Sequence, residues 1–261
     1  MRESLEGTDA VVTGAGRGLG RAVARALAAD GARIWAVDRT NEELDETVAL
    51  IERAGARVTA LRRDLADPGQ CREVATEVAS GASRVSVLVN AAAVLQEATV
   101  ADTTLDDWAS TLAINLTAPY VLSRAFAPRM VDRGGSLINV SSRAGTMPFA
   151  REAAYCASKH GIEALTKCLA LELADAPVSV NTITPGLCIK PTGLTEAAAA
   201  VAPSAQRRQW QDPLELGPAF AFLARLEGEV SGLRFDASHL AQALDLDGAE
   251  QVLAHAQELA E

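Results

Sequence analysis

Over the first 185 residues, short apolar runs rich in β-branched residues alternate with longer stretches whose apolar positions recur at helical spacing. The apolar runs predict strands at 10–13, 33–37, 57–61, 85–89, 136–140 and 178–183. The longer stretches predict helices near 18–30, 41–54, 68–80, 104–131 and 153–175. The run at 85–89 is nearly all apolar, as expected when both faces of a sheet are covered. This alternation predicts a doubly wound α/β fold, in which helices cover both faces of a parallel sheet.

The regular alternation ends after residue 186. Residues 190–212 contain prolines and a glycine around an alanine-rich piece, and we interpret them as an insertion over or beside a site, with one short helix at 195–201. A helix at 213–226 and a last strand at 232–235 follow. The chain then forms a helical tail at 239–261, and the apolar spacing after Gly248 predicts an amphipathic helix with Asp247 as a possible N-cap. We expect this helix to pack over the insertion or against a neighbouring subunit.

Composition and charge narrow the classes of function. The chain has 261 residues, of which 49% are hydrophobic and 22% charged, and it shows no repeat or low-complexity tract. We therefore interpret residues 1–261 as one domain. The net charge of −10 disfavours nucleic acids and anionic membrane surfaces as partners. No apolar run approaches the ~18 residues of a membrane helix, and the first residues lack the pattern of a secretory signal.

Cysteine and histidine usage gives no indication of a metal site. The four cysteines form no CxxC pair, and the three histidines lie far apart in the sequence. Reduced thiols in a cytoplasmic protein are the expected state.

A glycine-rich turn follows the first predicted strand, with the pattern Thr13-Gly14-x-x-x-Gly18-x-Gly20. A turn from a strand into a helix presents free N–H groups and the positive end of the helix dipole, which suits a pyrophosphate group. Glycine lets the backbone approach such a ligand closely. A tight strand–helix connection would need glycines in any case, so this turn alone leaves cofactor binding and simple chain geometry equally open.

Acidic residues end the second and third predicted strands. Asp38 lies where a carboxylate can accept hydrogen bonds from an adenosine ribose and repel a 2′-phosphate, which favours NAD over NADP. Arg17 and Arg39 are the neighbouring bases that could hold a 2′-phosphate instead. Asp64-Leu65 could border an adenine, although an aspartate at a strand end often only forms a turn.

Tyr155 and Lys159 are four residues apart in a predicted helix, so their side chains lie on one face. An ammonium beside a phenol should lower the tyrosine pKa from about 10 and make it a usable acid and base. On its own this spacing is common on helix surfaces. Ser142 follows the predicted strand at 136–140, at the carboxyl edge where open α/β sheets bind ligands.

Taken together, these motifs resemble those of the single-domain short-chain dehydrogenases/reductases. The matching pieces cover about residues 8–190 in the order of that family: Thr13-Gly14-x-x-x-Gly18-x-Gly20, Asp64-Leu65, Asn90-Ala-Ala, Asn115-Leu116, Ser141-Ser142, Tyr155-x-x-x-Lys159 and Pro185-Gly186. The resemblance implies a Rossmann-like sheet of about seven parallel strands, a nicotinamide cofactor and a Ser–Tyr–Lys catalytic group assisted by an asparagine.

The resemblance also implies a role for each matching residue. Tyr155 would exchange a proton with the substrate oxygen, Ser142 would hydrogen-bond that oxygen, and Lys159 would bind the nicotinamide ribose. Asn115 would hold a water that links Lys159 to solvent. The cofactor-binding residues would be Gly14, Arg17, Gly18, Leu19, Gly20, Asp38, Asp64, Leu65, Asn90, Tyr155, Lys159, Pro185 and Gly186.

Three segments depart from the family pattern. Asn90 is followed by three alanines where the family usually has a glycine, and Ala93 would be strained by a positive φ. Lys190 stands where the family commonly places a threonine that contacts the nicotinamide. The closing Asp-Gly-Gly is replaced at 235–238, and a tail of roughly twenty residues follows.

The sequence thus predicts an NAD(H)-dependent oxidoreductase, with NADP(H) also possible, that interconverts a secondary alcohol and a ketone as a homodimer or homotetramer. Two alternatives remain open. One is a redox-neutral epimerase or dehydratase on the same fold, which the altered nicotinamide segment keeps in play. The other is a non-catalytic cofactor sensor, although a sensor would need only the cofactor site.

Overall fold

The computed structural model describes residues 1–186, 189, 201–204 and 210–260. Seven strands form one sheet in the order β3-β2-β1-β4-β5-β6-β7, and every neighbouring pair is parallel. The strands are β1 (Asp9–Thr13), β2 (Arg33–Asp38), β3 (Val58–Arg62), β4 (Val85–Asn90), β5 (Gly135–Val140), β6 (Val178–Thr184) and β7 (Arg234–Asp236). The order reverses between β1 and β4, which opens a crevice at their carboxyl ends. The predicted doubly wound Rossmann-like fold is confirmed.

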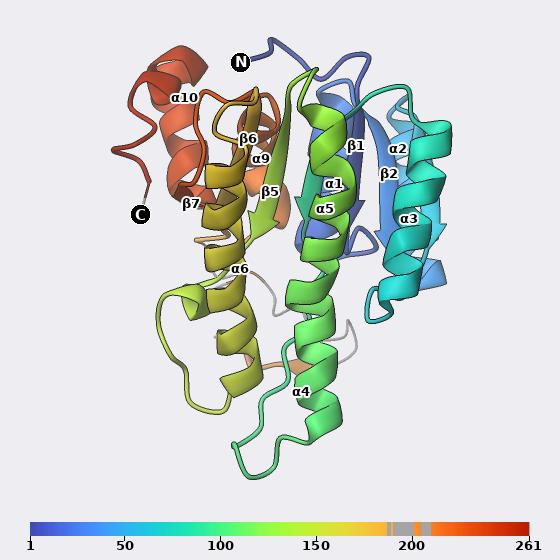
Figure 1. Ribbon diagram of the computed structural model, residues 1–261, viewed down its shortest axis with the longest axis vertical. Helices are drawn as coiled ribbons and strands as arrows, with labels where there is room; N and C mark the ends of the chain where they lie inside the picture. The colour runs from blue at the N-terminus through green and yellow to red at the C-terminus, as the bar shows by residue number, and fades with distance from the viewer. Residues whose placement is uncertain (187–188, 190–200, 205–209, 261) are drawn as a thin grey trace.

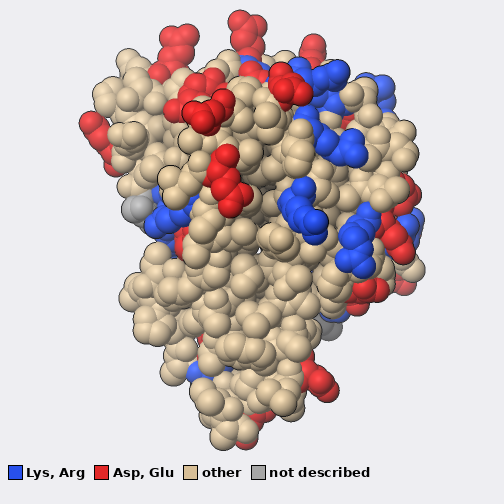
Figure 2. All heavy atoms as spheres, viewed as in Figure 1, with Lys and Arg blue, Asp and Glu red and all other residues tan. Residues whose placement is uncertain are grey.

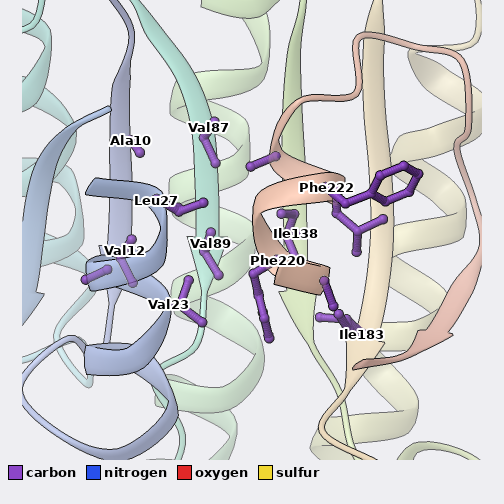
Figure 3. Close-up of a cluster of buried hydrophobic side chains, with 14 of the residues drawn as sticks. Ala10, Val12, Val23, Leu27, Val87, Val89, Ile138, Ile183, Phe220 and Phe222 are labelled. Atoms are coloured by element: carbon purple, nitrogen blue, oxygen red, sulfur yellow. The ribbon is translucent and has the colours of Figure 1, made fainter. Parts of the chain in front are cut away.

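Two layers of helices cover the sheet (Figure 1). One face carries α1 (Gly18–Ala29), α2 (Asn41–Arg53) and α9 (Gly217–Ala224), and the other carries α3 (Pro68–Gly81), α5 (Ala118–Met130) and α6 (Ala153–Glu172). Neighbouring side chains of β1 point to opposite faces of the sheet, since Val12 packs with α1 and Val11 packs with α3 and α5. Figure 3 shows the first layer, where Val23 and Leu27 of α1 meet β1 and β4. Helices therefore bury both faces of the sheet, which explains why the strands consist mainly of apolar residues.

The helix predicted at 104–131 contains a wide turn. It consists of α4 (Leu105–Leu112), a π-helical segment η1 (Ala113–Thr117) and then α5. Thr104 caps its start by accepting a hydrogen bond from the N–H of Asp107 at 3.0 Å. In Figure 1, α4 and the start of α6 extend beyond the carboxyl ends of the strands. These two helices therefore stand beside the crevice.

The last part of the chain covers the outer strand of the sheet. A short 3-10 segment, η3 (Pro213–Leu216), leads into α9, and β7 leads into α10 (Ala237–Ala254). Another 3-10 segment, η2 (Arg143–Gly145), lies earlier in the chain, between β5 and α6. Gly248 interrupts α10 with a φ of 77°, so a second helical piece begins after it, as predicted. Ala260 then forms an antiparallel bridge to Phe235 of β7. The tail packs on its own chain against β7, α9 and η3.

Two predicted features lie in segments that the structure does not describe. The helix expected at 195–201 and Lys190 lie outside the described residues, apart from Val201. No helix among the described residues is long and apolar enough to cross a bilayer.

We expect Val252→Ala to lower the free energy of unfolding by about 1–2 kcal/mol, because the Val252 side chain is 2% exposed within the core under the tail. The control is Leu246→Ala, on the helical piece before Gly248, where the side chain is 73% exposed and the change should stay within about 0.5 kcal/mol. Urea unfolding measures both. Equal effects of the two substitutions would show that the tail does not dock in solution.

Candidate active site

The predicted site residues converge on the crevice at the carboxyl edge of the sheet. A cavity of about 590 Å³ lies there, between the ends of β1, β2, β4 and β5 and the start of α6. Most of the predicted cofactor residues line it, including Tyr155 and Lys159. They are Gly14, Arg17, Gly18, Leu19, Gly20, Asp38, Asp64, Leu65, Tyr155, Lys159 and Pro185. Residues more than 140 positions apart in the sequence therefore line the same cavity.

The glycine turn is packed too closely for side chains. Gly14 has a φ of 67°, and a Cβ there would lie 2.8 Å from the Cα of Ala92. A Cβ on Gly20 would overlap the carbonyl oxygen of Gly14. The Thr13 hydroxyl accepts hydrogen bonds from the N–H groups of Ala91 and Ala92 at 3.0 and 3.1 Å. The turn after β1 is thus fixed against the turn after β4.

The start of α1 opens into the same cavity. Gly18, Leu19 and Gly20 line it, and Arg17 at the N-cap has no side-chain oxygen with which to cap the helix. The first N–H groups of α1 and its positive dipole end are therefore available to an anionic group. A pyrophosphate fits this cradle, since added side chains would close it.

Tyr155 and Lys159 line the other end of the cavity together with Ser141, whereas the predicted Ser142 is not among the lining residues. The Ser142 side chain lies close enough to the Tyr155 hydroxyl to lower its pKa. The Lys159 ammonium is 2% exposed, donates to the carbonyl oxygen of Val140 at 2.8 Å, and lies 5.5 Å from the centroid of the Tyr155 ring. This arrangement places a proton donor, a hydroxyl partner and a buried cation at one point of the crevice.

Comparison with known proteins agrees with this geometry. The family model for short chain dehydrogenases matches residues 8–201. The chain belongs to the short-chain dehydrogenase/reductase family. The family assignment, together with relatives named as dehydrogenases, identifies the chain as an oxidoreductase.

Its relatives include a D-threitol dehydrogenase of Mycolicibacterium smegmatis, which is 38% identical over 190 residues (72% of this chain, 73% of the relative). A 2,3-dihydro-2,3-dihydroxybenzoate dehydrogenase of Bacillus subtilis is 35% identical over 185 residues (70% and 71%). Among solved structures, a metagenomic short-chain oxidoreductase in complex with NADP has a TM-score of 0.75 at 34% identity, over 88% of this chain and 96% of that one.

Asp38 lies against the glycine turn of this dehydrogenase. Its two carboxylate oxygens accept hydrogen bonds from the N–H groups of Gly16 and Thr40, at 2.9 and 3.1 Å. Arg17 forms an ion pair with Glu43 at 3.2 Å. A carboxylate therefore stands at the end of β2 beside the cradle, and one of the two nearby bases already has an acidic partner.

The other predicted cofactor residues divide into two groups. Asp64, Leu65 and Pro185 line the cavity, although Asp64 also forms a turn by accepting the N–H of Ala66 at 2.9 Å. Asn90 and Gly186 lie outside the lining. The Asn90 amide donates to Asn139 at 2.8 Å inside the sheet, and Gly186 packs where any Cβ would overlap the Asp236 carboxylate.

Asn115 sits in the π-helical turn η1. Its amide oxygen accepts the N–H of Val94 at 2.8 Å, and its amide nitrogen donates to the Val94 carbonyl oxygen at 2.9 Å and to Ser158 at 3.1 Å. The side chain thus ties α6 to the wall formed after β4. The water-binding role implied for Asn115 remains a prediction, and π-helical turns of this kind are frequent at functional sites.

The expected direction of the Tyr155 pKa is wrong for the chain without ligand. Burial raises the pKa of Tyr155 above 10, while the Ser142 hydroxyl lowers it in part and the Glu152 charge adds to the rise. Burial also lowers the pKa of Lys159 to about 8, against the opposing effect of Glu163. The phenol is therefore protonated at neutral pH.

The strain foreseen at Ala93 is absent, because Arg151, with a φ of 69°, is the one non-glycine residue of the described chain with positive φ.

A larger cavity of about 880 Å³ lies at the opposite edge of the sheet, where β2 begins. It is lined by the ends of α1 and α2 and by residues of η3 and α9, with several alanines, three arginines and the acidic residues Glu6 and Asp30. The described lining has two carboxylates, Glu6 and Asp30, of which Asp30 is paired with Arg225, and it contains no serine, tyrosine or lysine like those at the carboxyl edge. The cavity at the carboxyl edge is accordingly the candidate active site.

We expect Gly20→Ala to weaken cofactor binding by more than about tenfold, because the new methyl group must displace the Gly14 carbonyl and distort the cradle. Gly55→Ala is the matched control. Gly55 has a positive φ of 83°, which strains any side chain there, but a Cβ at this position meets nothing within 4 Å, and Gly55 is not among the residues that line the candidate active site. Fluorescence titration with NADH distinguishes them, and equal affinities for both variants would contradict the close packing of the turn.

Proposed function

We propose that this short-chain dehydrogenase/reductase interconverts a secondary alcohol and a ketone, with NAD(H) as cofactor and Tyr155 as the acid and base. The observation that carries the proposal is that Tyr155 and the buried Lys159 line the same cavity as the glycine cradle, with the Ser142 side chain close to the Tyr155 hydroxyl. A nicotinamide cofactor, when bound, accepts or supplies the hydride. In this proposal the cofactor and the alcohol or ketone substrate bind to one domain, residues 1–261.

The side chains of the chain itself handle the proton and the developing charge. In ketone reduction, Tyr155 donates its proton to the substrate oxygen as negative charge builds there, and Ser142 donates a hydrogen bond to the same oxygen. The buried Lys159 ammonium stabilises the phenolate that remains. The raised pKa of Tyr155 keeps it protonated at neutral pH, which favours reduction, whereas oxidation must first remove that proton and should accelerate as the pH rises.

The substrate class that we propose is a small alcohol with neighbouring hydroxyl groups, or the corresponding hydroxyketone. Support comes from two relatives named for D-threitol and for 2,3-dihydro-2,3-dihydroxybenzoate. A panel of these two compounds, simple monoalcohols and the matching ketones, followed by the absorbance of reduced nicotinamide, tests the proposal. Activity that consumes no net cofactor would support a redox-neutral epimerase or dehydratase, and cofactor binding without turnover of any compound would support a cofactor sensor.

The preference for NAD rests on Asp38, whose carboxylate would lie close to a 2′-phosphate and repel it at short range. The related structure that binds NADP shows that the family also accommodates the phosphorylated cofactor. We expect Asp38→Ala to reduce the preference for NADH over NADPH by about tenfold or more, measured by calorimetry. Asp64→Asn is the control that should leave the ratio unchanged. Tighter binding of NADPH by the wild type would contradict the proposal.

We also propose a homo-oligomer, a dimer or tetramer, formed through the face of α4, α5 and α6. Figure 2 shows that the lower part of this face is poor in charged side chains. The apolar residues Trp108, Tyr120 and Leu171 are exposed on these helices. Trp108→Asp, on α4 in the lower part of this face, should lower the mass measured by sedimentation, and an unchanged mass would exclude this face. The free thiols of Cys71, Cys156 and Cys168 fit a reducing compartment, and we propose the cytoplasm.

A further inference from the structure

A buried ion pair lies directly behind the proposed catalytic residues. Glu163 on α6 and Arg234 on β7 are 9% and 7% exposed, and their side chains form an ion pair at 2.8 Å. The Glu163 carboxylate also accepts hydrogen bonds from the hydroxyls of Ser141 and Thr182, the latter at 2.8 Å. Four segments of the chain thus meet at one carboxylate, yet neither charged residue lines the cavity.

This ion pair is attached to the segment that carries Ser142. Arg234 donates to the backbone carbonyl oxygen of Ser142 at 3.4 Å and to the hydroxyl of Ser141 at 3.3 Å. Gly145, in the short helix after Ser142, has no room for a Cβ, which would lie 2.7 Å from the Ser141 hydroxyl and 3.2 Å from the Glu163 side chain. The backbone around Ser142 is therefore packed on the ion pair from two sides.

The same carboxylate lies one helical turn beyond Lys159. Residues four apart on a helix are neighbours, and Glu163 is the charged group that opposes the effect of burial on the Lys159 pKa. The other groups around Lys159 are Tyr155 on the same helix and the Val140 carbonyl on β5. Arg234 contributes a positive charge from β7, on the far side of Glu163.

We propose that Glu163 and Arg234 are positioning residues for the reaction: Arg234 fixes the backbone of Ser142, and Glu163 supplies the negative charge that holds Lys159 as an ammonium. The proposal rests on the proposed function of Ser142 and Lys159. A buried ion pair often adds little net stability, because desolvation of both charges offsets their attraction. A role in placing the catalytic groups explains why two charges are kept at this point.

The chain has only three lysines, Lys159, Lys167 and Lys190, so a nuclear magnetic resonance titration can follow Lys159 without any substrate. The protein is labelled with ¹³C at the lysine Cε, and Lys167→Arg and Lys190→Arg assign the signals. We expect Glu163→Gln to lower the Lys159 pKa by about one unit, because an opposite charge is removed. Arg234→Met should shift it upward. Glu172→Gln, an exposed position at the end of the same helix, is the control and should leave it unchanged.

Opposite shifts in the two variants are the signature of charge, which a purely structural role would not produce. Kinetics then test Ser142: Arg234→Met should reduce kcat about tenfold and leave the affinity for NADH within twofold. An unmoved Lys159 pKa in folded Glu163→Gln protein would overturn the role of Glu163, and an unchanged kcat in Arg234→Met would overturn that of Arg234.

Each single variant leaves one buried charge without its partner and could fail to fold. The double variant Glu163→Gln/Arg234→Met removes both charges, a change that proteins usually tolerate. If only this variant folds, the proposal requires a reduced kcat in it, and a wild-type kcat would overturn the proposal. Failure of the proposed function is seen separately, because Tyr155→Phe would then retain activity whatever happens to the Lys159 pKa.

Discussion

Tyr155→Phe should lower kcat by about 10²–10⁴-fold, or about 3–5 kcal/mol of activation barrier, because it removes the group that transfers the proton. The substitution deletes one hydroxyl and little volume. The glycine cradle is held by the Thr13 hydroxyl, and no hydrogen bond among the described residues joins the Tyr155 hydroxyl to it. The affinity for NADH should therefore remain within about twofold. Steady-state kinetics with an active substrate of the panel and fluorescence titration with NADH measure the two quantities.

The chain contains a natural control for this experiment, because its only other tyrosine is Tyr120. Tyr120 lies on α5 and is exposed, so Tyr120→Phe should leave kcat unchanged. Ser142→Ala should reduce kcat less than Tyr155→Phe does, since it deletes a hydrogen bond and leaves the proton donor in place. A Tyr155→Phe protein that binds NADH normally and turns over at the wild-type rate would remove Tyr155 from the mechanism and most of the support for the proposed function.

The strands could be predicted from the sequence because a sheet that is covered on both faces needs continuous apolar runs. The run predicted at 85–89 became β4 (Val85–Asn90), and the run at 57–61 became β3 (Val58–Arg62). The last strand was less well placed, at 232–235 instead of Arg234–Asp236. Gly232 has a φ of 80°, a conformation that a strand excludes and that the sequence pattern does not reveal.

Local spacing also explains which parts of the site could be predicted. The glycine turn and the pair Tyr155 and Lys159 each lie within eight residues, so the sequence displays them directly. Glu163 and Arg234 are 71 residues apart and meet only because β7 docks beside β6. Charged residues are mostly exposed, so nothing in the sequence separates this pair from surface charges.

The direction of the Tyr155 pKa could not be predicted for a related reason. Sequence spacing shows that an ammonium is near the phenol, which argues for a lowered pKa. The depth at which the fold buries both groups is a property of the folded chain, and for Tyr155 burial outweighs the neighbouring groups. The π-helical turn at Asn115 is likewise set by packing, since its sequence AINLT contains neither glycine nor proline.

The buried charge of Lys159 has a further consequence, for stability. Lys159→Met should raise the free energy of unfolding at pH 7 by about 2 kcal/mol while abolishing most of the activity. Folding lowers the Lys159 pKa from 10.5 to about 8, mainly through burial, so the buried ammonium costs at most about 3 kcal/mol. Loss of the hydrogen bond to the Val140 carbonyl oxygen offsets about 1 kcal/mol of the gain.

The pH dependence of this stability difference identifies its cause. Below about pH 8 both the folded and the unfolded states hold the Lys159 proton, and the destabilisation is complete. Between about pH 8 and 10.5 the unfolded state binds more protons than the folded state, so the wild type gains stability as the pH rises and approaches the variant. Urea unfolding of both proteins at pH 7 and pH 10 measures this convergence. Lys167→Met, at an exposed position of the same helix, is the control and should change stability by less than about 0.5 kcal/mol at either pH. A Lys159→Met protein less stable than wild type at pH 7 would mean that the contacts of the ammonium outweigh its desolvation.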